Sequence, residues 1–357
     1  MSERVEVKHM LKWIVATLLL FILSGCWDNK DINHRSLPIA MGVSYNQGQY
    51  TVYLDIPKVS ETDKIQVVSE SGDTINDIID KISMNMESEI DLLHLKIILV
   101  DKEFAKHGLN DGVSSLIRSR HVSPKTLFVI CDESPDRFFE KMDKNSNDGT
   151  LIYDFFQRNS GLSPEIAYTQ TWKIFRSIHS FTNDVVIPII KSGHTTAIES
   201  TGSAIMKNGK MVGRLNNEET LLINVFNGKK TQGKIEVMGK GTIQIVSNHL
   251  KHRSYFVDNQ ALLKSKLSLK VILLDTKGNP SEDSIKSDLN KLVLERFEHL
   301  FEKIKLGGAD VLGVGQHFRN ELTRTQLEEW HAEYFKNLKI DLQVSTTIRN
   351  TGNLKDT

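Results

Sequence analysis

The 357-residue sequence has few cysteines, no net charge and, after residue 26, no long apolar run. Lys and Arg number 45, as do Asp and Glu, so the overall charge does not indicate a nucleic-acid or strongly acidic partner. No apolar stretch after residue 26 reaches the roughly 20 residues that a transmembrane helix needs. Aromatic and β-branched residues are spread along the chain, which argues against long disorder.

Motifs of the common enzyme classes are also missing. Gly313-Val314-Gly315 has no preceding strand and no third glycine, so we interpret it as a helix-packing feature rather than a dinucleotide site. His331-Ala332-Glu333 has the spacing of the first zinc-deaminase motif, but no cysteine pair supplies the other ligands. The chain has no paired-histidine zinc helix, phosphate loop or nucleophile elbow. We therefore predict no enzyme activity, no catalytic residue, no metal site and no cofactor.

The clearest feature that is present lies at the N-terminus. Trp13 to Leu23 is about eleven residues of almost unbroken apolar character, too short to span a bilayer and typical of a signal-peptide core. The run ends in Leu23-Ser24-Gly25-Cys26, the pattern of a bacterial lipoprotein signal. Small residues before the cysteine give a signal peptidase access to the backbone. Positive charge precedes the run at Arg4, Lys8 and Lys12.

This pattern predicts a signal peptide over residues 1–25, cleaved after Gly25. Cys26 would carry S-diacylglycerol and an N-acyl chain, and the mature protein would face away from the cytoplasm. The alternative is a buried core helix that happens to end in cysteine. If Cys26 is lipidated, Cys131 has no partner for a disulfide. Cys131 ends the apolar run Leu127–Cys131, and we interpret it as a buried core residue.

The mature chain divides by pattern into two regions. Residues 26–190 alternate strands and helices, which predicts a mixed α/β sheet covered by helices, in one or two subdomains. Residues 191–202 are rich in Ser, Thr and Gly, and we interpret them as a linker. Residues 203–357 begin with a hairpin signal, Asn208-Gly209, continue with a helix start at Asn216, where Glu219 completes a capping-box pattern, and then show further helices and strands. The period-two alternation of residues 340–348 predicts the last strand. The expected fold class is therefore α+β or mixed α/β, with two to three domains and a largely antiparallel sheet in the last.

Several motifs together resemble a known family. Gly25-Cys26-Trp27-Asp28, followed by Asp31-Ile32-Asn33, is similar to the mature start of the Ger(x)C lipoproteins. The strand at His94–Leu99 and the segment from Gly202 through Gly213 to Glu219-Thr220 resemble further signatures. Asp31 stands where the family usually has Glu, and Thr323-Arg324-Thr325 stands where a proline is expected. The last domain is matched by Ala309-Asp310-Val311-Leu312-Gly313-Val314-Gly315, Trp330 and Ile348-Arg349-Asn350-Thr351-Gly352.

The resemblance implies a non-enzymatic C subunit of a spore nutrient germinant receptor. Such a subunit would be anchored on the outer face of the spore inner membrane and would work with integral-membrane A and B subunits. It also implies a three-domain α/β assembly. The sequence also allows two other interpretations: a solute-binding lipoprotein of a transporter, and a lipoprotein enzyme acting on the cell wall. The first should show repeated βα units in its C-terminal half, and the second needs a convergent catalytic site.

Overall fold

The computed structural model describes residues 12–14, 35–57, 65–118, 122–145, 151–157, 163–228, 234–237, 241–258, 260–278 and 280–349. The chain forms two compact units, Met1–Ser36 and Leu37–Thr357. In the first unit, the described part includes the short strand β1 (Arg35–Ser36). All further elements belong to the second unit.

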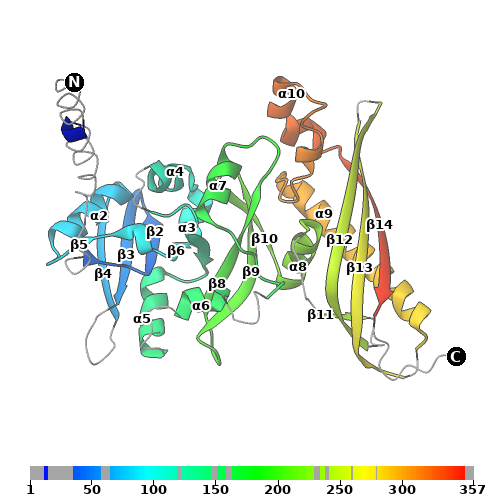
Figure 1. Ribbon diagram of the computed structural model, residues 1–357, viewed down its shortest axis with the longest axis horizontal. Helices are drawn as coiled ribbons and strands as arrows, with labels where there is room; N and C mark the ends of the chain where they lie inside the picture. The colour runs from blue at the N-terminus through cyan, green and yellow to red at the C-terminus, as the bar shows by residue number, and fades with distance from the viewer. Residues whose placement is uncertain are drawn as a thin grey trace, which may run out of the picture. The chain divides into compact units, whose positions relative to one another are not determined.

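Eight strands of the second unit form one sheet, in the order β10-β9-β8-β7-β6-β2-β3-β4 (Figure 1). The four central strands β2, β6, β7 and β8 pair in parallel, and the pairs toward both edges are antiparallel. Buried parallel strands are typically continuous apolar runs, as Leu127–Cys131 is. The strands are β2 (Ala40–Asn46), β3 (Gln49–Pro57), β4 (Ile65–Gly72), β6 (Ile97–Asp101), β7 (Leu127–Cys131), β8 (Val185–Ser192), β9 (Ile198–Lys207) and β10 (Lys210–Leu215).

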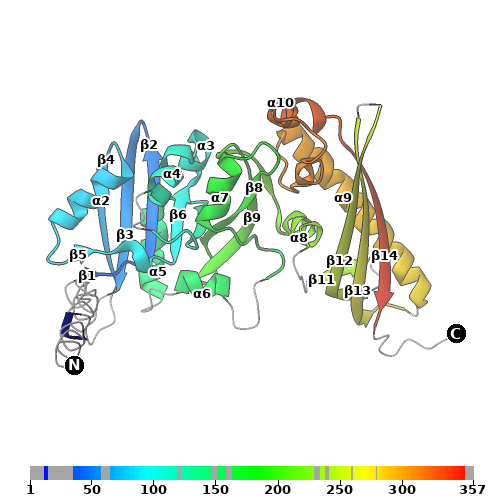
Figure 2. The ribbon, with the colours of Figure 1, turned by 45° about the horizontal axis from the view of Figure 1, so that its top comes forward.

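Helices cover both faces of this sheet because its strands bury side chains on both faces (Figures 1 and 2). Along β6, for example, Ile98 and Val100 enter one core while Ile97 and Leu99 enter the other. The first core is closed by α2 (Ile75–Met84), α3 (Lys102–His107), α4 (Asn110–Arg118) and α7 (Thr171–Ile178), the second by α5 (Pro135–Asn145) and α6 (Leu151–Gln157).

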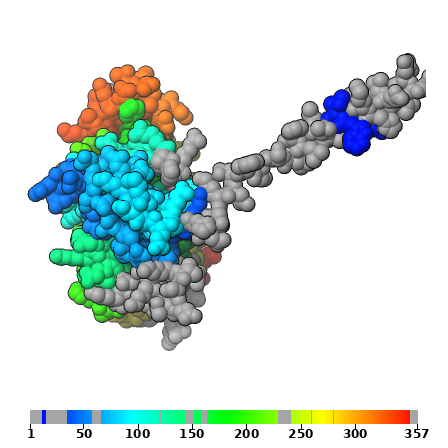
Figure 3. Space-filling model, turned by 90° about the vertical axis from the view of Figure 1, so that its left-hand side faces the viewer, coloured from blue at the N-terminus to red at the C-terminus, as the bar shows by residue number. Residues whose placement is uncertain are grey.

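At the β4 edge, α2 and β4 lie at the surface, in light blue in the space-filling view of Figure 3. Two short elements precede β6 in the chain, β5 (Glu89–Ile90) and the 3₁₀ turn η2 (Leu92–His94). Cys131 is free and fully buried in the second core, which confirms its interpretation as a core residue. Burial, the largest influence, raises the pKa of its thiol to about 12, so the thiol is un-ionised at neutral pH.

The prediction of a linker at residues 191–202 is wrong, because most of these residues belong to two strands. β8 ends at Ser192, β9 begins at Ile198, and the two strands pair antiparallel within the eight-stranded sheet. The hairpin at Asn208-Gly209 is confirmed, with both residues at positive φ, and it adds β10 to the edge of the same sheet. It is followed by α8 (Asn217–Phe226), which begins with the predicted capping box of Asn216 and Glu219.

A second sheet has the order β11-β12-β13-β14. The first two pairs are antiparallel, whereas β13 and β14 pair in parallel, so the chain must cross over between them through α9 (Glu282–Gly307). The helix lies along one face of the sheet (Figures 1 and 2). The strands are β11 (Lys234–Val237), β12 (Gly241–Val257), β13 (Gln260–Thr276) and β14 (Lys339–Ile348), and between α9 and β14 lie η3 (Val314–His317), α10 (Arg324–Glu328) and the π-helical turn η4 (Trp330–Tyr334).

Candidate functional site

The predicted lipidation residues Leu23, Ser24, Gly25 and Cys26 lie outside the described residues, so the anchor stays a prediction. Within the described part of the chain, no helix is long and apolar enough to cross a membrane. The same residues contain no group of three or more His, Cys, Asp and Glu side chains that could hold a metal ion. A buried cluster of hydrogen-bonded polar side chains lies where the loop after α9 meets the segment that precedes β8.

Asp310 stands at the middle of this cluster and is fully buried. Its carboxylate accepts hydrogen bonds from the backbone N–H groups of Val314 (2.9 Å) and Gly315 (2.7 Å) and from Trp330 Nε1 (3.0 Å). The loop can wrap its own aspartate because Gly313 takes the left-handed conformation, with φ of 62°. A Cβ at Gly315 would lie 2.6 Å from Trp330 Cε2, so this position has room only for glycine.

Asp184 joins the loop to the larger sheet. Its backbone N–H donates to the Asp310 carbonyl (2.9 Å), and its Oδ2 accepts from the backbone N–H of Asp310 (2.7 Å). His331 Nε2 lies 2.6 Å from the same Oδ2. The π-helical turn thus sends two consecutive side chains, Trp330 and His331, to two different carboxylates. The resulting cluster of Asp184, Asp310, Trp330 and His331 ties residues that are 147 positions apart in the chain.

Burial dominates the electrostatics of the cluster. It raises the pKa of Asp310 to about 7, against the opposing effect of the hydrogen bonds from Gly315 and Val314. The donors to Asp310 are backbone amides and an indole, so the geometry fixes the loop rather than presenting a reactive group. We interpret the cluster as a structural latch between the entry to β8 and the loop after α9.

The sequence pattern alone did not predict this cluster. Asp184 carries no local motif, and its partner Asp310 is 126 residues away. The glycines Gly313 and Gly315, interpreted as a helix-packing feature, in fact shape the loop that wraps Asp310. The family resemblance did point to this part of the chain. Its matching segments include Asp310, Gly313, Gly315 and Trp330.

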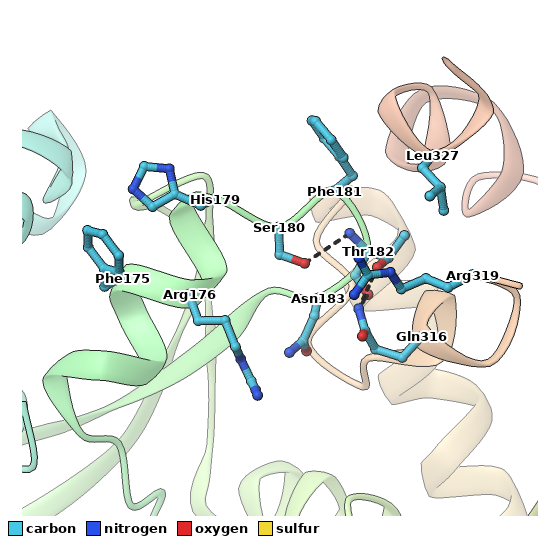
Figure 4. A pocket seen from close by; sticks show the side chains of 10 residues that line it. All are labelled: Phe175, Arg176, His179, Ser180, Phe181, Thr182, Asn183, Gln316, Arg319 and Leu327. Carbon is cyan, nitrogen blue, oxygen red and sulfur yellow. Dashed lines mark hydrogen bonds between the residues drawn. The ribbon is translucent and has the colours of Figure 1, made fainter. Parts of the chain in front are cut away.

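A pocket of about 500 Å³ lies beside the latch (Figure 4). Thr182 and Asn183, which precede Asp184, form one wall with Gln316, whose amide donates to the Thr182 carbonyl (3.3 Å). Arg176 comes from α7, and its guanidinium lies 5.1 Å from the centre of the Trp172 ring. Figure 4 shows the side chains that line the pocket, which come from α7 and the segment after it and from the segment that follows α9: Phe175, Arg176, His179, Ser180, Phe181, Thr182, Asn183, Gln316, Arg319 and Leu327.

The fold and the latch define an α/β protein with two sheets that share a core and a buried carboxylate pair. Residues 28–192 match the family described as "Spore germination protein N-terminal domain", and residues 201–352 match "Spore germination B3/ GerAC like, C-terminal". The chain therefore belongs to the GerAC family of spore germination proteins. It is a C subunit of a spore germinant receptor, a class of subunit that is not enzymatic.

Relatives in Bacillus subtilis (strain 168) match more than four fifths of the chain. Spore germination protein A3 is 23% identical over 374 residues, covering 96% of this chain and 98% of the relative. Spore germination protein B3 is 25% identical over 316 residues, covering 83% of this chain and 82% of the relative. The crystal structure of the GerBC protein superposes with a TM-score of 0.57 at 14% identity, covering 87% of this chain and 97% of that one. This last likeness shows that the fold is shared.

Proposed function

We propose that this receptor subunit is a lipoprotein held on the outer face of the spore inner membrane through Cys26. The observation that carries the proposal is the position of the family match. The N-terminal match begins at residue 28, directly behind Cys26, so the apolar run and the lipobox precede the family's own domain. Membership of a family of germinant-receptor C subunits implies a membrane-associated lipoprotein.

The partners in this proposal are the integral-membrane A and B subunits of the receptor. Their association is implied for the family as a class. For this chain we propose that the anchor holds the mature chain from residue 26 onward beside these subunits, so that nutrient-triggered germination depends on the assembled complex. Diacylglycerol supplies two acyl chains, and each buried methylene contributes about 0.8 kcal/mol to membrane binding, whereas one chain alone is marginal.

Replacing Cys26 tests the anchor. Cys26→Ala should leave the precursor uncleaved and unlabelled by radioactive palmitate, and germination through this receptor should fall. Cys131→Ala is the matched control because it removes the only other cysteine, which is buried. Its lipid labelling should equal that of the unmodified chain. Labelling that persisted in Cys26→Ala would disprove the proposed anchor.

Association is tested separately by affinity purification of the tagged chain from spore membranes. Recovery of the A and B subunits with the unmodified chain, and their loss with Cys26→Ala, is the expected result. A chain that is lipidated but recovers neither subunit would contradict the proposed assembly while leaving the anchor intact.

A further inference from the structure

The second sheet has one covered face and one open face. Side chains along its strands alternate between the two: in β13, Leu263, Leu267 and Leu269 are buried, whereas Lys264, Lys266 and Lys270 are exposed. The buried side chains pack against α9 and its neighbours. The exposed side chains of β12, β13 and β14 form a face that no described helix covers, which we call the open face.

The open face is strongly cationic. Lys251 of β12 lies directly opposite Lys266 of β13, and Arg253 lies directly opposite Lys264. All four side chains are exposed, and among the described residues none of them makes an ion pair. The acidic residue beside them is Asp341, opposite Lys264 on β14. A chain whose charges balance overall thus concentrates positive charge here.

Two such pairs side by side require an explanation because like charges directly opposite on neighbouring strands are destabilising. A binding partner with negative charge would remove this repulsion between the paired cations. A hollow of about 500 Å³ lies among these side chains, lined in part by Lys251, Arg253, Lys264, Lys266, Asp341 and Gln343.

One end of the open face is apolar. Tyr255 is 39% exposed and Val257 is 53% exposed, and both continue the exposed row of β12 beyond Arg253. The ammonium of Lys264 lies 5.8 Å from the centre of the Tyr255 ring. Tyrosine beside basic residues is a combination typical of surfaces that meet the headgroup region of a bilayer.

We propose that the open face of β12–β14 docks on a bilayer surface that carries anionic phospholipid headgroups. A sheet face presents cations as a two-dimensional array, about 6.8 Å apart along a strand and about 4.8 Å between strands, which suits many phosphates in a plane. Lysine ammonium groups serve as point charges for phosphate without demanding one geometry. The inference rests on the proposed function in one respect only: the lipid anchor keeps the open face near a membrane.

Amine footprinting of the full lipidated chain tests this assignment. The chain is reconstituted in vesicles of phosphatidylcholine, or of phosphatidylcholine with phosphatidylglycerol, and acetylation of each lysine is followed by mass spectrometry. In the anionic vesicles, acetylation of Lys251, Lys264 and Lys266 should be about fivefold slower. Lys81 of α2, Lys125 in the turn before β7 and Lys291 of α9 are exposed internal controls whose rates should not change. The protection should fade at high salt.

A charge variant with a matched control completes the test. In the triple variant Lys251→Gln, Lys264→Gln, Lys266→Gln, Lys270, a lysine of the open face that is left in place, should lose its protection. In the triple variant Lys81→Gln, Lys125→Gln, Lys291→Gln, which removes as many charges, Lys270 should stay protected. Equal protection of the three open-face lysines in both vesicle types would overturn the assignment, as would their protection by polyglutamate but not by anionic vesicles. The palmitate labelling of Cys26 is independent of every one of these outcomes.

Discussion

Asp310 combines features that oppose each other. It is fully buried, which favours the neutral acid, yet its oxygens accept three hydrogen bonds, which favour the carboxylate. Burial is the larger effect, and the pKa rises to about 7 from an ordinary value of about 3.9. The residues near Asp310 in the sequence do not indicate this balance, because its largest contribution is burial, which exists only in the folded chain.

A pH dependence of stability follows from this raised pKa. Between the unfolded and folded pKa values, the folded chain holds a proton on Asp310 that the unfolded chain has released. The free energy of unfolding contributed by Asp310 should therefore be fully present below about pH 4 and should be lost as the pH rises to about 7. Asp310→Asn removes this titration.

Urea unfolding at pH 5 and at pH 7.5 measures the effect. Asp310→Asn should be destabilised at both values, by about 1–3 kcal/mol, because one carboxylate oxygen is replaced by an amide NH₂ that faces N–H donors. The difference between the unmodified chain and the variant should shrink as the pH rises. A difference that stayed constant with pH would show that Asp310 is ionised in the folded chain throughout this range.

At the scale of elements, local signals predicted the parts whose partners are close in sequence. Asn208-Gly209 indicated its hairpin, and Asn216 with Glu219 indicated the start of α8. The small residues of 191–202 indicated a linker, but they are small because backbones approach closely there. At Gly202, a Cβ would lie 1.9 Å from the Leu215 carbonyl oxygen across the hairpin. The sequence shows that these residues are small, but the close approach of backbones that requires small residues is visible only in the paired strands.

The like-charge pairs of the open face also belong to this scale. Lys266→Glu would place opposite charges across β12 and β13, next to Lys251. We expect the free energy of unfolding to rise by about 0.2–1 kcal/mol, since cross-strand opposite charges are favourable and like charges are not. Chemical denaturation at low salt measures this change.

Lys266→Gln is the control for Lys266→Glu because it removes the repulsion without adding attraction, and it should give a smaller gain. A variant with Glu less stable than the one with Gln would show that Lys251 and Lys266 do not interact across the strands. If stability rises while protection by anionic vesicles falls, the cationic pairs are retained for binding rather than for folding.

At the scale of the whole second unit, the two sheets share one core. Val186 of β8, Ile205 of β9 and Leu215 of β10 pack in the same cluster as Leu263 of β13 and Trp330. The period-two pattern of residues 340–348 predicted the last strand, and the structure confirms it as β14. The pattern could not show that β14 pairs in parallel with β13, because alternation determines which side chains share a face and not which strand lies alongside.

Truncation before Lys339 tests how far the second unit depends on this strand. The deletion removes Ile348, which is buried, and Ile340, Leu342 and Val344, which are half-buried against the cores under α9. It also removes the partners of the β13 backbone groups that face β14, over ten residue pairs from Leu262 to Val271. Burial contributes roughly 1.5–3 kcal/mol for each fully buried apolar side chain, against a total stability of about 5–15 kcal/mol for a domain.

The truncated chain should therefore lose its native cooperative melt. Because the core is shared, the loss should extend to β9 and the edge strand β10 rather than stop at the second sheet. Deleting only residues 353–357 should be nearly neutral, since that end is polar and carries no strand pattern. Thermal melts followed by circular dichroism compare the two deletions, and hydrogen exchange locates the change. A near-native melt without β14 would mean that α9 and the remaining strands suffice to close this core.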